Sequence, residues 1–231
     1  MNILRTSLLA LALVPAALFA AAPAQPAAPA FDSSIVSGLG ARNIGSAAMS
    51  GRISSLDAVT LPDGKLMVWV GAASGGVWKS LDGATTFTPV FDDQPVQSIG
   101  AVEIDKRNPE TVWVGTGEAW TRNSVSIGNG IYRTTDGGDT WQHLGLDGSE
   151  RISDIRIDPR ASDTVYACVT GRLWSDSLER GVYRTRDGGK TWQQVLKAPN
   201  ASTGCASLSM DEKNPDVLDA ARWDFCRKGW T

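Results

Sequence analysis

Thr134-Thr135-Asp136-Gly137-Gly138-Asp139-Thr140-Trp141 is one of three copies of an octapeptide, and this repetition indicates the fold of the chain. The others are Ser80–Phe87 (Ser-Leu-Asp-Gly-Ala-Thr-Thr-Phe) and Thr185–Trp192 (Thr-Arg-Asp-Gly-Gly-Lys-Thr-Trp). The motif suits a tight hairpin, since aspartate accepts hydrogen bonds from the turn's own backbone and glycine supplies positive φ. The closing tryptophan begins the next strand, and we expect its ring to be largely buried. The aspartates stand 54 and 51 residues apart, a period that indicates a repeat architecture.

The sequence on the N-terminal side of each motif repeats as well. An aromatic-basic strand directly precedes it, at 76–79, 130–133 and 181–184. An apolar strand comes before that one, at 68–71, 112–115 and 165–168. A strand of period-two alternation comes first, at 99–105 and 152–158, and a further copy begins at 205–211. One unit therefore contains four short strands separated by turns, which is the size and content of a propeller blade.

The predicted fold class is all-β, a β-propeller of four-stranded antiparallel blades. Units cover about 52–91, 98–145 and 151–197, and a fourth stops after two strands, so that about three and a half blades are present. The fourth unit also has Asp219 where the others have an aromatic residue. Closed propellers have about four to eight blades, so we expect residues 40–231 to be the N-terminal part of a longer one. A small protein that completes its ring by association is the alternative, and open strand edges predict self-association or aggregation.

The first thirty residues have a different composition. A basic start, an apolar run over 8–22 interrupted by Pro15, and the small residues Ala22-Pro23-Ala24 are typical of a secretory signal peptide. We therefore predict a signal peptide at 1–24, a Pro/Ala-rich linker and lead-in at 25–39, and a periplasmic or secreted location. An uncleaved membrane anchor is the alternative, and we expect no transmembrane segment after removal of the signal.

Charge and cysteine content exclude several classes of function. The net charge is −3 without a basic block, so a surface that follows nucleic-acid phosphates is unsupported. The chain has one histidine, His143, and no Cys-x-x-Cys, which argues against a metal site, and no motif indicates a cofactor. Cys168 is interpreted as a small core residue, with a Cys168–Cys205 bridge as the alternative; Cys226 lies in the tail, and the disulfide state is left open.

Four further segments are distinctive: 43–53, 73–79, 91–100 and 113–118. Together with the three octapeptides, which resemble the Asp-box or BNR repeat, they make the chain similar to exported bacterial propeller proteins labelled BNR-repeat glycosyl hydrolase or sortilin N-terminal domain-containing. The resemblance covers about residues 40–231 and implies a propeller fold. Members of that family are typically far longer, in agreement with an N-terminal fragment. The hydrolase label rests largely on the boxes themselves.

Carboxylates are the first candidates for chemistry. Asp82, Asp136 and Asp187 belong to the boxes, and we interpret them, with Trp141 and Trp192, as structural. Glycoside hydrolysis needs two carboxylates about 5–10 Å apart, and Glu118, Asp176 and Glu179 in long loops are weak catalytic candidates, with Asp154 as a fourth. A sialidase is disfavoured because the Phe-Arg-Ile-Pro signature is missing.

Tryptophans are the better-supported candidates. Trp120 and Trp174 lie in long loops between second and third strands, and Trp223 has the matching place in the fourth unit. Tryptophan rings stack on sugars or cap peptide side chains, although these rings could also fold back on the blade edge. The favoured hypothesis is an exported binding or scaffold module for peptide, protein or glycan ligands. The alternatives are a BNR-type glycoside hydrolase domain with catalytic loops partly missing, and a degenerate fragment without function.

Overall fold

The computed structural model describes residues 52–120, 122 and 125–227. The predicted signal peptide at 1–24 and the linker at 25–39 lie outside this range. Strands and turns dominate the described residues, and the helical segment among them is one short 3-10 turn, Asp147–Ser149. No helix in the described part of the chain is long and apolar enough to span a membrane.

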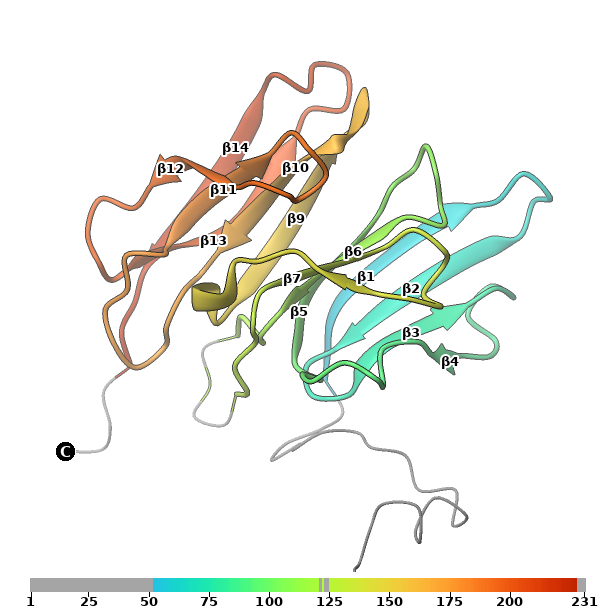
Figure 1. Cartoon of the computed structure of the whole chain (residues 1–231), viewed down its shortest axis with the longest axis horizontal. Coiled ribbons are helices and arrows are strands. Elements are labelled where there is room, and N and C mark those ends of the chain that lie inside the picture. The colour runs from blue at the N-terminus through green and yellow to red at the C-terminus, as the bar shows by residue number, and fades with distance from the viewer. Residues whose placement is uncertain (1–51, 121, 123–124, 228–231) are drawn as a thin grey trace, which may run out of the picture. The chain divides into compact units, whose positions relative to one another are not determined.

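Three sheets of four antiparallel strands follow one another along the chain (Figure 1). Blade 1 contains β1 Ile53–Thr60, β2 Leu66–Ala72, β3 Gly76–Ser80 and β4 Thr88–Pro89. Blade 2 contains β5 Ile99–Ile104, β6 Val112–Thr116, β7 Ile131–Thr134 and β8 Gln142–His143. Blade 3 contains β9 Ile152–Asp158, β10 Ala161–Val169, β11 Gly181–Thr185 and β12 Gln193–Lys197. The half-blade contains β13 Thr203–Met210 and β14 Leu218–Asp224.

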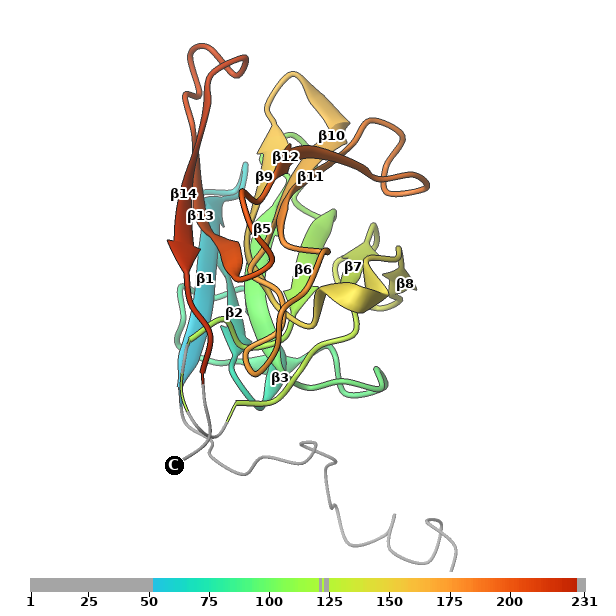
Figure 2. The same ribbon diagram turned by 90° about the vertical axis from the view of Figure 1, so that its left-hand side faces the viewer.

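The same strand order recurs in every blade, and the predicted β-propeller architecture is confirmed. The first strands β1, β5, β9 and β13 are the inner strands, and hydrogen bonds join them in sequence. The Ile104 amide donates to Asp57 Oδ2 at 2.7 Å, and the Leu208 amide donates to Asp154 Oδ2 at 2.9 Å. The outer strands β8 and β12 lie on the side away from β1 and β13 (Figure 2).

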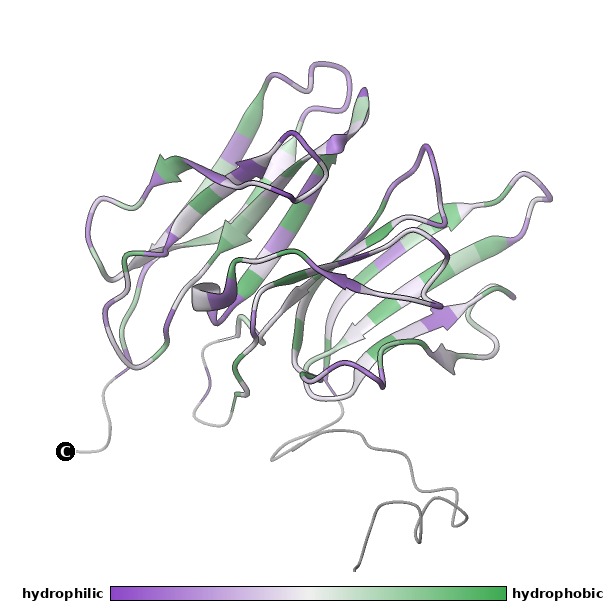
Figure 3. Ribbon diagram, viewed as in Figure 1, coloured by the Kyte–Doolittle hydropathy of each residue, from purple (hydrophilic) through white to green (hydrophobic). Residues whose placement is uncertain are grey.

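Apolar cores lie between consecutive sheets. Met67, Trp69 and Val77 of blade 1 pack with Val102 and Val112 of blade 2. Two similar clusters join blade 2 to blade 3, and blade 3 to the half-blade. The apolar residues are concentrated in the strands, while the turns that join them are mostly polar (Figure 3). Each blade is therefore stabilised mainly by burial against its neighbour rather than by a core of its own.

The Asp-boxes form the hairpins between the third and fourth strands. In the second box, Asp136 Oδ1 accepts hydrogen bonds from Thr134 Oγ1 at 2.7 Å and from the Thr140 amide at 2.9 Å. Asp187 repeats both contacts in the third box, with Thr185 and Thr191. These hydrogen bonds stabilise the charged form and lower the pKa of Asp187 to about 2, with Thr191 as the main cause. The box carboxylates are engaged by their own turns.

The box tryptophans cross to the preceding blade. Trp141 packs edge-on against Trp69 and Phe91, with ring centroids 6.2 and 4.9 Å apart, and its indole N–H donates to the Val90 carbonyl at 2.6 Å. Trp192 has the same relation to Trp113, and its indole donates to the Leu144 carbonyl at 2.8 Å. Both rings have intermediate exposure and pack against the apolar clusters between blades, in agreement with the structural role expected of them. They lie at the boundary between consecutive blades.

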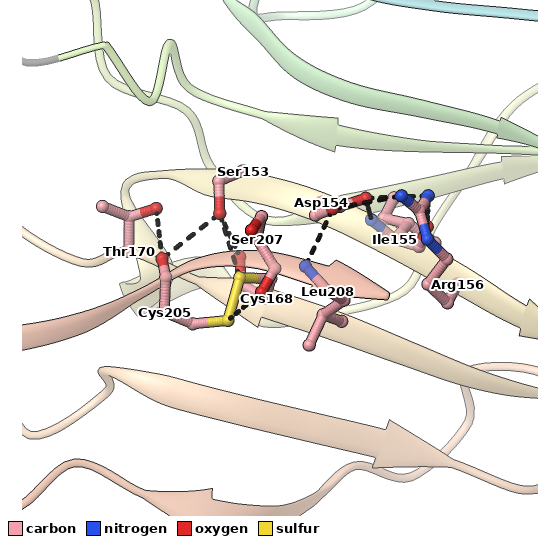
Figure 4. The surroundings of a disulfide bond; sticks show 9 residues. All are labelled: Ser153, Asp154, Ile155, Arg156, Cys168, Thr170, Cys205, Ser207 and Leu208. Atoms are coloured by element: carbon pink, nitrogen blue, oxygen red, sulfur yellow. Dashed lines mark hydrogen bonds and ion pairs between the residues drawn. A yellow bond between two sulfur atoms is a disulfide. The ribbon is translucent and has the colours of Figure 1, made fainter. Parts of the chain in front are cut away.

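A disulfide ties blade 3 to the half-blade (Figure 4). Cys168 of β10 and Cys205 of β13 have Cα atoms 5.2 Å apart, and both are fully buried. The interpretation of Cys168 as a free core residue is therefore corrected, and the bridge is formed. Ser153 Oγ donates to the Cys205 carbonyl at 3.2 Å, and Thr170 Oγ1 donates to the same oxygen at 2.9 Å. The packing of consecutive blades brings the two cysteines together across 37 residues.

Candidate ligand-binding site

Every inner strand contains a β-bulge near its N-terminal end, and the four bulged residues share one place. In β1 the ladder skips Ser54, in β5 Gly100, in β9 Ser153 and in β13 Ala206. A bulge leaves its residue unpaired and re-aims it, and bulges are common beside functional sites. These four residues all line a hollow of about 230 Å³. Sequence reasoning missed the bulges, although the irregular alternation of the inner strands was their signal.

The remaining wall of this aromatic hollow consists of Ala119, Trp120, Thr170 and Trp223. Trp120 follows β6 through Gly117, whose φ of +88° turns the chain out of the strand. A Cβ on Gly117 would lie 1.9 Å from the Glu150 carbonyl oxygen, so that glycine is required there. Trp120 and Trp223 are 63 % and 47 % exposed. Two rings distant in sequence therefore stand at one small opening.

The third predicted tryptophan, Trp174, is about half exposed but does not line the hollow. Trp223 lies within β14, opposite Gly204 in the ladder, so its prediction as a loop residue is wrong. The half-blade's second strand extends further than the sequence alignment with Trp120 and Trp174 implied.

The weak catalytic candidates do not meet at this site. Glu118 is fully buried, and Arg52 binds both of its carboxylate oxygens, at 2.8 and 2.5 Å. Glu179 accepts a hydrogen bond from Ser177 Oγ at 2.7 Å, which lowers the pKa of its carboxyl. Asp176 is exposed in the same loop. Asp154, which lies in β9, accepts a hydrogen bond from the Leu208 amide of β13. Burial raises the pKa of Asp154. Among the described residues, no acid lines the aromatic hollow.

The opposite end of the inner strands carries a charged cavity of about 560 Å³. Asp57, Glu103, Arg156 and Ser209 have equivalent ladder positions in β1, β5, β9 and β13, and all four line it together with Lys106. Lys106 pairs with Asp57 at 2.5 Å, and Arg156 pairs with Glu103 at 3.2 Å. Burial, with Asp57 nearby, raises the pKa of Glu103 to about 8. Sequence reasoning missed this cluster; charged residues inside period-two strands were the available signal.

Metal binding has no support in the described part of the chain, where no group of three or more histidine, cysteine, aspartate or glutamate side chains could hold an ion. The aromatic hollow instead combines ring faces, hydroxyl groups and backbone. Such a surface can stack on a flat apolar ligand face while its polar groups bind hydroxyls.

Similarity to known proteins agrees with this architecture. The family model described as "Sortilin, neurotensin receptor 3" matches residues 129–228. A Paenibacillus xyloglucanase is 27 % identical over 124 residues, which are 49 % of this chain and 11 % of that enzyme. A probable oligoxyloglucan-reducing end-specific xyloglucanase of Neosartorya fischeri is 35 % identical over 81 residues, 33 % of this chain and 9 % of that protein. The described residues form a β-propeller fold with three Asp-boxes.

A solved structure supports the fold of this Asp-box propeller. An ancestral GH74 enzyme superposes with a TM-score of 0.60 at 18 % identity, over 74 % of this chain and 22 % of that one. At that identity the likeness concerns the fold alone. The Asp-box propeller thus spans about a tenth of the length of the two xyloglucanases and about a fifth of the ancestral enzyme.

Proposed function

We propose that this propeller binds a glycan at the aromatic hollow and serves as a substrate-binding part of a glycoside-hydrolase-type protein. The observation that carries the proposal is the convergence of the four bulged residues with Trp120 and Trp223 around one opening. Sugar rings have an apolar face and peripheral hydroxyls, and the hollow offers exposed indole faces beside Ser54, Ser153 and Thr170.

The glycan class follows from the relatives. Both curated relatives reported above act on xyloglucan or its oligosaccharides by name, so a xyloglucan-derived oligosaccharide is the first ligand to test. A peptide or protein ligand remains the competing hypothesis for the same hollow. We also infer an exported location, because the buried Cys168–Cys205 bridge would persist in an oxidising compartment.

Isothermal titration of the chain without its predicted signal peptide at 1–24 with xyloglucan oligosaccharides tests the proposal. Trp120→Ala and Trp223→Ala should each weaken binding about tenfold or more, equivalent to about 1.4 kcal/mol. Trp174→Ala is the matched control, because this ring is also exposed yet lies outside the hollow. Equal losses in all three variants, or no binding by the parent protein, would reject the hollow as a glycan site.

Hydrolysis is a second candidate function, favoured by the pair of acids in the charged cavity. Glycoside hydrolysis uses a protonated carboxyl as acid and an ionised carboxylate as base or nucleophile. Burial raises the pKa of Glu103 to about 8, which favours its protonated form, and Asp57 lines the same cavity. Release of reducing ends from xyloglucan that disappears in Glu103→Gln, and in Asp57→Asn, would support this function. Activity unchanged by both substitutions would reject these two residues.

A further inference from the structure

Among the described residues, the guanidinium of Arg180 is buried and no carboxylate accepts a hydrogen bond from it. The side chain is 1 % exposed and lies directly before β11. Nη1 donates to the Thr170 carbonyl at 2.9 Å, and Nη2 donates to the carbonyls of Arg172 and Ser175. A planar guanidinium can hold several carbonyls in one fixed arrangement, whereas an ammonium cannot match that geometry.

The loop between β10 and β11 folds around this side chain. Gly171 has a φ of +86°, and a Cβ there would lie 2.5 Å from Arg180 Cγ. The loop also binds the half-blade's end, since the Arg227 amide donates to the Leu173 carbonyl at 3.0 Å. Burial lowers the pKa of Arg180, because desolvation disfavours the charged form. The side chain is held by carbonyls of its own loop, and its contacts continue beyond that loop.

Two of the contacts of Arg180 lead to the aromatic hollow. Thr170, whose carbonyl it binds, is a lining residue. On the other side the guanidinium carbon lies 4.7 Å from the ring centre of Phe225. Phe225 in turn packs against Trp223, with ring centroids 5.1 Å apart. One side chain therefore connects Thr170 and Trp223, which come from blade 3 and the half-blade.

The opposite side of the hollow has a separate anchor. Arg52 holds Glu118 through two hydrogen bonds, and the Glu118 amide donates to Ser98. Trp120 follows two residues later in the same loop. Arg180, in contrast, contacts its own loop and Phe225, so its contacts among the described residues lie on the Trp223 side of the hollow.

We propose that Arg180 is a positioning residue that sets Thr170 and Trp223 against Trp120 at the aromatic hollow. The inference rests on the proposed glycan-binding function for its consequence, but its structural part can be tested without any ligand. A cation–π contact and three carbonyl bonds together fix the Trp223 side, so their loss should displace that ring while Trp120 stays in place.

The ligand-free test uses the chain without its predicted signal peptide at 1–24, labelled with 5-fluorotryptophan, with resonances assigned by single Trp→Phe variants. Arg180→Met should shift or broaden the fluorine signals of Trp223 and Trp174 and leave that of Trp120 unchanged. Arg52→Met is the matched control and should affect Trp120 alone. If Arg180→Met fails to fold, Phe225→Leu provides the second variant, since it removes the ring contact and keeps the carbonyl bonds. An unmoved Trp223 signal in the folded variants would overturn the proposal.

The binding test is a double-mutant cycle with a xyloglucan-derived heptasaccharide as probe. Arg180→Met should weaken binding about tenfold in the parent and about twofold or less in Trp223→Ala, because the ring it positions is already gone. In Trp120→Ala the tenfold loss should persist, and Arg180→Lys should recover part of the affinity. Equal losses in all backgrounds would mean a merely structural role. If the probe does not bind at all, the proposed function fails while the fluorine spectra still decide the role of Arg180.

Discussion

Blade 1 and blade 2 have the same strands and the same box, yet they differ on the face that meets a preceding sheet. Leu56 in β1 is 62 % exposed, whereas its ladder equivalents Val102, Ile155 and Leu208 are at most 4 % exposed. Among the described strands, β1 packs against β2 and β5. Burial of the inner strand therefore comes from the neighbouring blade and not from its own sheet.

The Asp-boxes show the same distinction between contacts within a blade and contacts between blades. Asp82 closes its turn as the other two aspartates do, with Oδ1 accepting from the Thr86 amide at 2.9 Å. Its aromatic residue differs: Phe87 is 40 % exposed and lacks the N–H that Trp141 donates to Val90. The hairpin is therefore a local structure, and the ring that follows it is a contact between blades.

The largest expected difference in stability concerns the aromatic residue that closes each box. Trp192→Ala should lower the free energy of unfolding by about 3 kcal/mol, because it removes the packing on Trp113 and leaves the Leu144 carbonyl without its donor. Phe87→Ala should cost less than about 0.5 kcal/mol. Urea unfolding followed by circular dichroism measures both. Similar losses in the two variants would show that Phe87 is covered in solution.

The inner strands offer a second, slightly smaller contrast. Ile155→Ala should cost about 2–3 kcal/mol, since the side chain is fully buried between blades 2 and 3. Leu56→Ala should change the unfolding free energy by less than about 0.5 kcal/mol. The same urea titration measures both variants. A large loss of unfolding free energy in Leu56→Ala would mean that another sheet packs on β1.

The charged residues at equivalent positions of the inner strands make the stability of the fold depend on pH. The pKa of Glu103 is about 8 in the folded chain and about 4.3 when unfolded, so the folded state retains the proton between these values. Stability should then fall as pH rises from about 5 to 8, by up to about 1 kcal/mol per pH unit. Glu103→Gln should flatten this slope. The thermal midpoint measured at several pH values tests it, and Asp57→Asn should also reduce the slope, since Asp57 raises the pKa of Glu103.

The smallest expected change in stability concerns the turn of the first Asp-box, which differs from the other two turns at Ala84. Ala84 has a φ of +68°, where the second and third boxes have glycine, and an L-residue is strained there. Ala84→Gly should stabilise the chain by about 0.5–1 kcal/mol. Gly138→Ala is the reverse change, and its Cβ would also meet Trp69 at 3.0 Å, so it should destabilise by more. A loss of stability in Ala84→Gly would contradict the strain at this turn.

Much of the fold could be predicted from the sequence, because its signals are local. The Asp-Gly-Gly turn, the alternating strands and the period near 50 residues each depend on groups within a few residues of one another. They identified the strand order and the position of every box hairpin. The long loops that carry Glu118, Trp120 and Trp174 were also found, since insertions between second and third strands are visible in the repeat.

The contacts between blades depend on the tertiary structure. Cys168 and Cys205 form their bridge, and Trp141 leaves its own sheet, because neighbouring sheets pack face to face. Trp223 and Trp120 meet because residues of all four sheets line one hollow. The pKa of Glu103 likewise depends on burial by another sheet and on Asp57, 46 residues away along the chain. A repeat determines each unit through contacts within it, whereas the geometry of any site shared by several units depends on contacts over long sequence separations.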